Sequence, residues 1–185
     1  MELIGTVVRL QVQRSRLKPG RVPHRVYDPA PLLVATALDV NPRGVVGETA
    51  DGPVLDVHHA DHPDTRNVKL TNGLSVMTRP RYARLRAQYG EQLIDGIAGE
   101  SVLLDTDGDL TGALALESES GLLQLTGEPA PPCVEFSRFV IGRGPADTGP
   151  EVLAALVALD GGARGHYLTT QDSGRVRVGH RLFRV

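Results

Sequence analysis

The chain has 185 residues, of which 41% are hydrophobic and 23% are charged, and its formal net charge at pH 7 is −2. This composition is typical of a globular protein with a sizeable core and excludes a disordered chain. The small net charge and an aromatic content of 4% without tryptophan disfavour nucleic-acid binding, which uses basic surfaces and stacking platforms. We therefore expect a large single globular domain, or a domain with one appendage, that does not bind nucleic acid.

The N-terminal segment argues against a membrane segment and against export. Glu2 and Arg9 stand where a signal peptide would have an uninterrupted apolar core, and no apolar run is long enough to span a membrane. A single cysteine gives no sign of an oxidising compartment. We expect a cytoplasmic protein without membrane contact.

A strand and a basic loop are predicted at the start of the chain. Residues 3–13 alternate, with Val8, Leu10 and Val12 on one face. The loop RSRLKPGRVPHR contains five cationic side chains, namely Arg14, Arg16, Lys18, Arg21 and Arg25. Guanidinium groups bind phosphate and carboxylate well, although such a run is more often a solvated loop. The pattern leaves both interpretations open and favours the solvated loop.

Two apolar segments follow. The run PLLVATALDV, residues 31–40, predicts a single strand that is buried on both faces. The segment GVVGE, residues 44–48, predicts a tight bend where the backbone passes close to another segment.

The stretch DVHHADHPDTRNVKL is rich in histidine and aspartate. Its spacing matches no helical zinc signature, so we expect a polar loop that ends where a strand begins at Val68. Within this loop, Asp56 could orient His58 beside Arg66 at the mouth of a pocket, because a carboxylate fixes the orientation of an imidazole.

The second half of the chain predicts two helices among short strands. A helix is expected over 78–89, with Thr78 as its N-cap and Gly90 after its end. Strand patterns follow in IDGIAGESVLLD and in DTDGDLTGALALESESGLLQLTG. A second helix is predicted over 151–159, and the tail predicts a closing β-hairpin around the turn at 172–174.

The only cysteine, Cys133, lies in GLLQLTGEPAPPCVEFSRFVIGRG and cannot form an intrachain disulfide. Three prolines make its approach rigid, and a helical turn is expected over 133–139. Arg138 and Arg143 bring positive charge to this region, and nearby cations favour a reactive thiolate. A free cysteine more often only packs in the core, so both roles remain open.

Four stretches, taken in order, resemble the MOSC family, the domain related to the C-terminal part of molybdenum-cofactor sulfurases. GVVGE is similar to the family's GVxGD, with Glu48 in place of aspartate, and DVHH followed by TRNVKL is similar to DxH…RxVxL. LQLTGEPAPPC resembles the strand that leads to the family's cysteine. ARGHYLTTQDSGRVRVGHRL resembles the closing RGxYaxVxxgGxIxxGDxV, with His180 in place of aspartate. GES at 99–101 stands where relatives often have GEN.

This resemblance runs from about residue 31 to the C-terminus and rests on the order and spacing of the motifs. It implies a mainly β, β-barrel-like fold with a few peripheral helices. Residues 1–30 would add a first strand and the basic loop to a single MOSC-like domain over 1–185.

The resemblance also implies a site. Cys133 would be the catalytic residue that carries sulfur as a persulfide, or the ligand of a molybdenum ion. Asp56, His58, Arg66 and Arg164 would bind or orient an anionic molybdenum cofactor, a molybdopterin.

Three functions are compatible with these residues. The favoured one is a sulfur carrier or molybdenum-cofactor-binding domain, with a cysteine desulfurase as sulfur donor and a molybdoenzyme or redox protein as partner. Pyridoxal phosphate would belong to the donor, because neither Lys18 nor Lys69 lies in apolar surroundings suited to a Schiff base. The alternatives are a molybdenum-dependent reductase of N-hydroxylated compounds, which would need an electron-donating partner, and a non-catalytic barrel that binds a small molecule or a protein.

Overall fold

The computed structural model describes all residues from 1 to 185 and is mainly β, with 37% strand and 15% helix. The strands are β1 (Glu2–Gln13), β2 (Leu32–Ala35), β3 (Ala37–Asn41), β4 (Gly44–Thr49), β5 (Gly52–Leu55), β6 (Leu74–Thr78), β7 (Val102–Asp105), β8 (Gly112–Ser118), β9 (Gly121–Pro129), β10 (His166–Thr169), β11 (Gly174–Arg177) and β12 (Arg181–Arg184). The helices are α1 (Arg79–Tyr89), α2 (Val134–Val140) and α3 (Pro150–Ala158).

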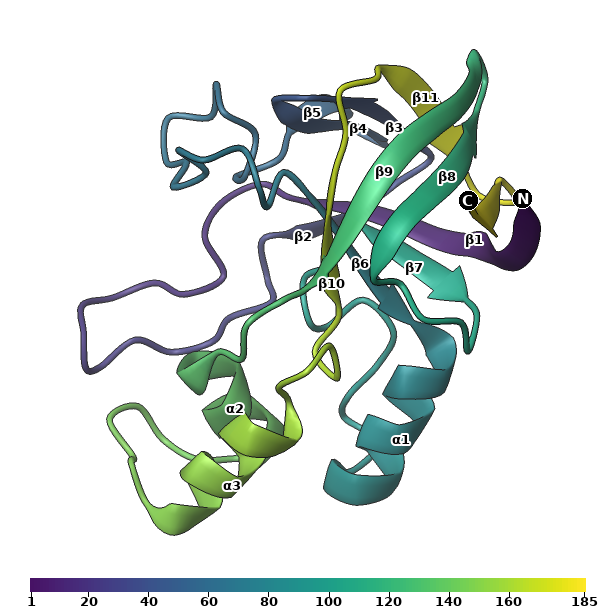
Figure 1. Ribbon diagram of the computed structural model, residues 1–185. Coiled ribbons are helices and arrows are strands. Elements are labelled where there is room, and N and C mark those ends of the chain that lie inside the picture. Colours follow the sequence, from purple (N-terminus) through teal and green to yellow (C-terminus); the bar gives the residue numbers. More distant parts are fainter.

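Seven strands close into a barrel in the order β1, β12, β8, β9, β10, β6 and β7, with β7 returning to β1. All neighbours are antiparallel except β6 and β7. The pairing of β1 with β12 closes the barrel and brings Glu2 opposite Arg184, so the two chain ends lie side by side (Figure 1). A closed barrel leaves no unpaired strand edge within the ring. The predicted mainly β, barrel-like fold is therefore confirmed.

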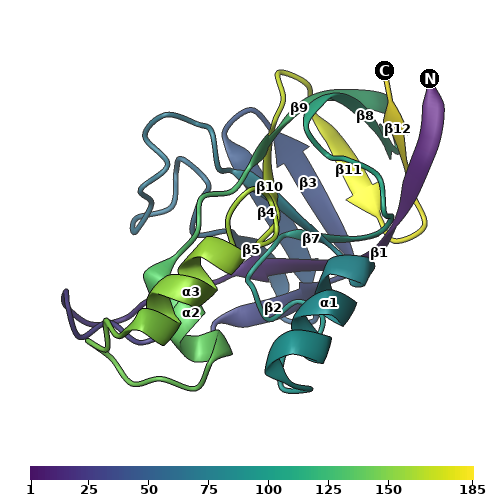
Figure 2. The same cartoon turned by 60° about the horizontal axis from the view of Figure 1, so that its bottom comes forward.

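The remaining strands and the helices lie around this barrel. Strands β11, β3, β4 and β5 form a separate four-stranded sheet. Strand β2 pairs with the C-terminal residues of β1, from Leu10 to Gln13. Figure 1 shows the small sheet at one end of the barrel and the three helices at the other. In Figure 2, α2 and α3 lie together, apart from α1. None of the three helices is long and apolar enough to cross a membrane.

Two apolar clusters form the core. The larger one fills the barrel with side chains such as Leu10, Leu114 and Leu125, and the smaller one lies under the helices and contains Tyr82 and Phe136. The burial of these side chains is the main favourable contribution to folding. The second cluster matters for function, because it also contains the only cysteine of the chain.

The helices agree with the sequence. The Thr78 side chain accepts a hydrogen bond from the Arg81 backbone N–H at 3.4 Å, so it caps α1. Gly90 ends this helix, and Tyr82 and Leu85 are its buried residues. Helix α3 also forms where the apolar periodicity predicts it.

The predicted arrangement of β1 is wrong at Val8. The pairing of β1 with β7 shifts register between Val7 and Arg9, as at a β-bulge. The extra residue turns Val7 into the barrel, together with Leu10 and Val12, while Val8 packs against the cluster under the helices. Alternation alone does not reveal a bulge, because apolar residues are present on both sides of it.

Two further strand predictions need correction. The segment 31–40 is not one strand, because the chain leaves β2 at Thr36 and enters β3 in the other sheet. GVVGE forms most of strand β4 rather than a tight bend. The expected close approach does occur there, since a Cβ on Gly47 would lie only 2.5 Å from Val12 Cγ1.

The prediction of a strand at Val68 and that of a closing hairpin are also wrong. Val68 is 89% exposed, and the next strand begins only at Leu74. In the tail, β10 pairs with β6 and β9 of the barrel, whereas β11 pairs with β3 of the small sheet. The turn thus carries the chain from one sheet to the other. Periodicity identifies strands but not their partners, which depend on contacts between distant segments.

We predict that Gly47→Ala lowers the free energy of unfolding by about 1–3 kcal/mol, because the added methyl group overlaps Val12 where β4 crosses β1. Gly144→Ala is the control, since no atom lies within 4 Å of a Cβ built there, and it should change stability by less than about 0.5 kcal/mol. Urea denaturation measures both. Equal stability of the two variants would contradict the proposed crossing.

Candidate functional site

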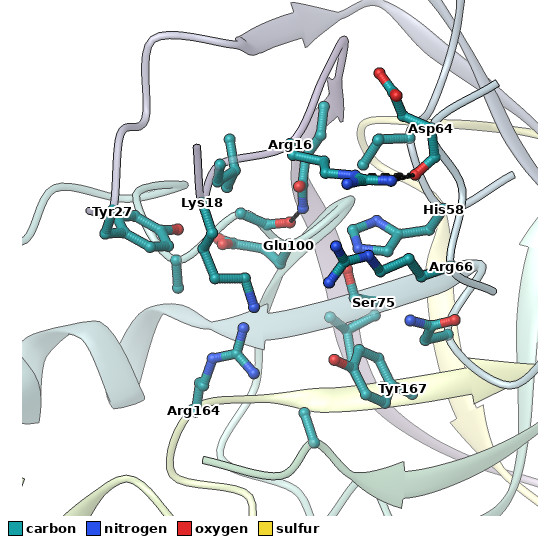
Figure 3. Close-up of a pocket in the computed structure, with 18 of the residues that line it drawn as sticks. Arg16, Lys18, Tyr27, His58, Asp64, Arg66, Ser75, Glu100, Arg164 and Tyr167 are labelled. Atoms are coloured by element: carbon teal, nitrogen blue, oxygen red, sulfur yellow. Dashed lines mark hydrogen bonds between the residues drawn. The ribbon is translucent and has the colours of Figure 1, made fainter. Parts of the chain in front are cut away.

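A cavity of about 250 Å³ lies where segments distant in sequence meet. Its wall is formed by the end of β1 with the basic loop, by the polar loop after β5, by strand β6, by residues 98–100 and by the start of β10. Figure 3 shows the labelled side chains of these segments around a common space. The barrel therefore brings together residues that no local pattern could connect.

Positive charge dominates the wall of this cavity. Five cationic side chains line it, namely Arg16, Lys18, Arg25, Arg66 and Arg164. None of the five forms an ion pair with a carboxylate. The only acidic residues in the wall are Asp64 and Glu100. Guanidinium and ammonium groups without protein counter-ions favour an anionic ligand.

The favoured interpretation of the basic loop is thereby corrected. Three of its five cations, Arg16, Lys18 and Arg25, line the cavity instead of belonging to a purely solvated loop. Arg16 donates to the Asp64 carbonyl oxygen at 2.7 Å, which ties this loop to the polar loop. The density of cations in the loop was the available signal, but the sequence could not show which way they face.

Arg164 reaches the cavity from the turn between α3 and β10. Its Nη1 donates to the Pro131 carbonyl oxygen at 2.9 Å, and its guanidinium carbon lies 6.0 Å from the centre of the Phe136 ring. Burial alone would lower the pKa of Arg164, but the opposing influence of Cys133 and Tyr167 leaves it above the ordinary value. Arg164 is thus held against both sides of the cysteine segment and remains charged.

The structure brings Asp56, His58 and Arg66 together in unequal roles. His58 and Arg66 line the cavity, whereas Asp56 is buried behind them. One Asp56 oxygen accepts from the Gln13 backbone N–H at 2.8 Å, and the other faces His58 Nδ1 at 3.0 Å. A carboxylate at Nδ1 fixes the imidazole orientation and leaves Nε2 for other partners. Asp56 therefore positions His58 and does not contact the cavity itself.

Cys133 lies beside the cavity rather than in its wall. The residue is 7% exposed and immediately precedes α2, in agreement with the expected helical turn. Its thiol donates to Glu135 Oε2 at 3.3 Å, and Lys18 Nζ lies 3.6 Å from Sγ. Lys18 contacts the thiol and also lines the cavity, so it connects the two.

The two arginines expected near the thiol are engaged elsewhere. Arg138 donates to the carbonyl oxygens of Asp147 and Pro23, and Arg143 pairs with Glu151. The expectation that they supply positive charge to Cys133 is therefore wrong. The nearby cations are instead Lys18, 115 positions away in sequence, and Arg164, which the family motif also suggested as a partner of the thiol and whose pKa Cys133 raises. No group of three or more histidine, cysteine, aspartate or glutamate side chains is arranged to hold a metal ion.

Glu100 is the second acidic residue of the cavity wall, and sequence reasoning gave it no role. It is 5% exposed and accepts a hydrogen bond from the Tyr82 hydroxyl at 2.8 Å through Oε2, while Oε1 has no partner. Burial raises the pKa of Glu100 to about 7. Its loop is fixed by the buried amides of Gln11 and Gln13, which donate to the carbonyl oxygens of Gly96 and Gly99.

His166 is a further residue of the wall that the sequence did not identify. It is buried, with Nδ1 2.9 Å from Arg81 Nη1 and Nε2 3.3 Å from the Thr111 hydroxyl. Burial and the Arg81 guanidinium lower the pKa of His166 to about 4. Since Arg81 can only donate, Nδ1 accepts and Nε2 carries the proton. His166 is thus a neutral donor at pH 7 and adds no charge to the cavity.

Comparisons with known proteins identify the fold. No family model matches the chain, and no curated protein matches it in sequence. Among solved structures, the YuaD protein from Bacillus subtilis is 14% identical, with a TM-score of 0.57 over 97% of this chain and 94% of that one. YiiM from Escherichia coli is 14% identical, with a TM-score of 0.53 over 100% of this chain and 71% of that one.

A structure described only as a hypothetical protein is 16% identical, with a TM-score of 0.58 over 99% of this chain and 70% of that one. YuaD and YiiM are MOSC-domain proteins, so the likeness supports a MOSC-type fold for this chain. At these identities the likeness concerns the fold alone.

We predict that Glu100→Gln stabilises the protein increasingly as the pH rises. The pKa of Glu100 is about 7 in the folded protein against 4.5 for a free side chain, so the folded state binds the proton more tightly. Stability therefore falls as the pH rises through this range and stays lower above it. The variant should exceed wild type by about 2–3 kcal/mol at pH 8 and by less than about 1 kcal/mol at pH 5.

Urea denaturation at several pH values measures this difference. The contribution of His166, which titrates in the opposite sense, is present in both proteins and cancels. A stability difference that stays constant between pH 5 and pH 8 would contradict a buried carboxyl with a raised pKa.

Proposed function

We propose that this chain is a MOSC-type domain that binds an anionic molybdenum-pterin cofactor in the cavity and accepts or delivers sulfur through Cys133. The main observation in support is the convergence of five cations without carboxylate partners beside the only thiol of the chain. A cysteine desulfurase would supply the sulfur, and a molybdoenzyme or redox protein would be the partner that receives the product.

The polar groups of the wall fit such a cofactor. Three buried side-chain atoms lack a hydrogen-bond partner, Arg25 Nε, Arg164 Nε and Glu100 Oε1, and all three residues line this cavity. Buried polar atoms are rarely left unpaired, so a ligand or water is expected to pair with them. Arg66 and Arg164 would hold the phosphate of the cofactor, and His58, oriented by Asp56, would contact it. The bound molybdenum would supply two-electron chemistry and a site that accepts sulfur.

The surroundings of Cys133 suit sulfur transfer. Glu135 accepts a hydrogen bond from the Cys133 S–H group and can take its proton, while the Lys18 ammonium stabilises the thiolate that remains. This thiolate attacks the outer sulfur of a donor persulfide, a new S–S bond forms on Cys133, and the donor leaves as a thiolate. Because the thiol is only 7% exposed, Lys18 and the basic loop have to move aside before a donor reaches it.

A molybdenum-dependent reductase, with Cys133 as metal ligand, is the second candidate. The low exposure of the thiol favours it, since a metal ligand need not be reached by a second protein. Thiolate is also a suitable soft ligand for such a metal. Both candidates share the cavity and differ in whether Cys133 holds the metal or exchanges sulfur.

We predict that protein purified from a host that makes the molybdenum cofactor contains molybdenum and pterin. Arg66→Gln and Arg164→Gln should each reduce this content about tenfold or more, because each removes a charge-assisted contact with the phosphate. Arg143→Gln is the control, since Arg143 pairs with Glu151 and does not line the cavity.

Metal analysis and pterin fluorescence measure the content. Cofactor-free wild-type protein, or equal content in all three variants, would contradict the proposed function. Loss of molybdenum from Cys133→Ser with pterin retained would favour the reductase. Full molybdenum content in Cys133→Ser, together with loss of persulfide formation, would favour the sulfur carrier.

We predict that Lys18→Gln slows alkylation of native Cys133 by iodoacetamide about three- to tenfold at pH 7, because the neighbouring ammonium stabilises the reactive thiolate. The matched control is Lys69→Gln, which changes the only other lysine of the chain, an exposed residue. Faster alkylation in Lys18→Gln would mean instead that Lys18 acts only as a steric cover. Mass spectrometry at timed intervals gives the rates.

A further inference from the structure

Two reactive side chains meet at the edge of the cavity. Lys18 Nζ lies 3.6 Å from Cys133 Sγ, and this ammonium has no other hydrogen-bond partner and no carboxylate to pair with. The basic loop and the residue before α2 bring the two groups together from positions 115 apart in sequence. An amine held against a sulfur atom can become joined to it when the sulfur is oxidised. This contact therefore has a chemistry that anion binding and sulfur transfer do not use.

A small oxidant can approach this contact through the cavity. Lys18 lines the cavity wall, and Cys133 retains 7% exposure beside it. Hydrogen peroxide is far smaller than a protein donor, so it reaches the sulfur without displacement of the basic loop. Lys18 contacts the sulfur and Arg164 interacts with it electrostatically, so both favour the thiolate that peroxide oxidises. Figure 3 shows these two side chains pointing toward one another.

The surroundings of Cys133 leave its oxidised form few ways to react. A sulfenic acid condenses with a second thiol to a disulfide or with a nitrogen to a sulfenamide. Cys133 is the only cysteine, so the first route has no intrachain partner. Glu135 Oε2 lies 3.3 Å from Sγ, but water would hydrolyse any product of a carboxylate oxygen with the sulfur. The Lys18 amine is the side-chain nitrogen that contacts the sulfur, which favours the second route.

We propose that Cys133 and Lys18 form a reversible crosslink under oxidising conditions, a sulfenamide bond between Sγ and Nζ, which makes the site sensitive to peroxide. The formation of this bond does not depend on the proposed function. Its effect rests on that function in one respect, that the cavity binds an anion beside the thiol. The pair thus serves as a modification site that places the cavity under redox control.

The reaction consumes one hydrogen peroxide and releases two water molecules. The Cys133 thiolate attacks a peroxide oxygen and the O–O bond breaks, so sulfur is oxidised by two electrons to the sulfenic acid and the other oxygen leaves as water. The Lys18 nitrogen, after losing a proton, then attacks the sulfur. The S–N bond forms, the S–O bond breaks, and the leaving hydroxyl takes up a proton and departs as the second water. Overall, thiol, ammonium and peroxide give the sulfenamide, two waters and one proton, which Glu135 or solvent accepts.

The crosslink changes both parts of the site. The Lys18 nitrogen no longer carries a charge, so the cavity keeps four of its five cations. Sγ is no longer free to carry sulfur or to bind a metal, and the basic loop is tied to the start of α2. A thiol reverses the reaction, because it attacks the sulfur, breaks the S–N bond and releases Lys18 as an amine. A second thiol then frees Cys133 and leaves with the first as a disulfide.

The experiment treats the reduced wild-type protein with a small excess of hydrogen peroxide, followed by proteolysis and mass spectrometry. The matched variant is Lys18→Arg, which keeps the positive charge beside the sulfur but replaces the amine by a guanidinium that stays protonated and is a poor nucleophile. Lys69→Arg is the control at the only other lysine. Dimedone, which reacts with sulfenic acids, reports oxidised sulfur that has not been crosslinked.

We expect wild type and Lys69→Arg to give one pair of peptides joined through Lys18 and Cys133, with a mass about 2 Da below the sum of the two reduced peptides. Dithiothreitol should separate this pair. Lys18→Arg should give no joined pair and about fivefold more dimedone adduct at Cys133, because the sulfenic acid has lost its partner. Crosslinked wild type should bind inorganic phosphate about three- to tenfold more weakly in titration calorimetry, because one cation is gone.

Oxidised wild type in which Lys18 and Cys133 remain on separate peptides would overturn the inference, whatever the fate of the variant. A joined pair that retains a peroxide oxygen would overturn the direct S–N bond. A sulfenamide to the Val134 backbone nitrogen, which joins no second peptide, would do the same. Absence of phosphate binding to both the reduced and the crosslinked protein would contradict the proposed anion site and leave the crosslink intact.

Discussion

The pairing of β1 with its neighbours is the constraint on which the rest of the structure depends. Its first half pairs with β12 and closes the barrel, so the two ends of the chain must meet before the ring is complete. Its second half carries the side chains of Gln11 and Gln13, which hold the loop that contains Glu100, and the Gln13 backbone N–H binds Asp56. One strand therefore closes the core and positions two sides of the cavity.

The cavity concentrates like charge at a cost in stability. Five cations without carboxylate partners repel one another, and the fold gains no ion pair in return, although other arginines of the chain form many. Arrangements that disfavour the folded state without a ligand are typical of binding sites, because the ligand supplies the missing counter-charge. The buried atoms of Arg25, Arg164 and Glu100 that lack a hydrogen-bond partner also disfavour the folded state without a ligand.

Cys133 and Glu100 lie at different places relative to the cations of the cavity. Cys133 belongs to the apolar cluster under the helices and meets the cavity through Lys18 and Arg164, which both line it. Glu100 lies in the wall itself, and burial rather than the cations governs its pKa. The thiol is thus largely shielded from solvent, whereas a carboxyl with a raised pKa stands in the cavity wall.

The sequence by itself determined the mainly β class, helix α1 with its Thr78 cap, helix α3 and some of the strands, because these depend on local propensity and periodicity. The motif match named Arg66 and Arg164, and the fold places both on one cavity. Tertiary structure alone decided the bulge at Val8, the partners of β10 and β11, and the positions of Lys18 and Glu100. Strand pairing and burial arise from contacts between segments far apart in the chain, and no local pattern encodes which of them will meet.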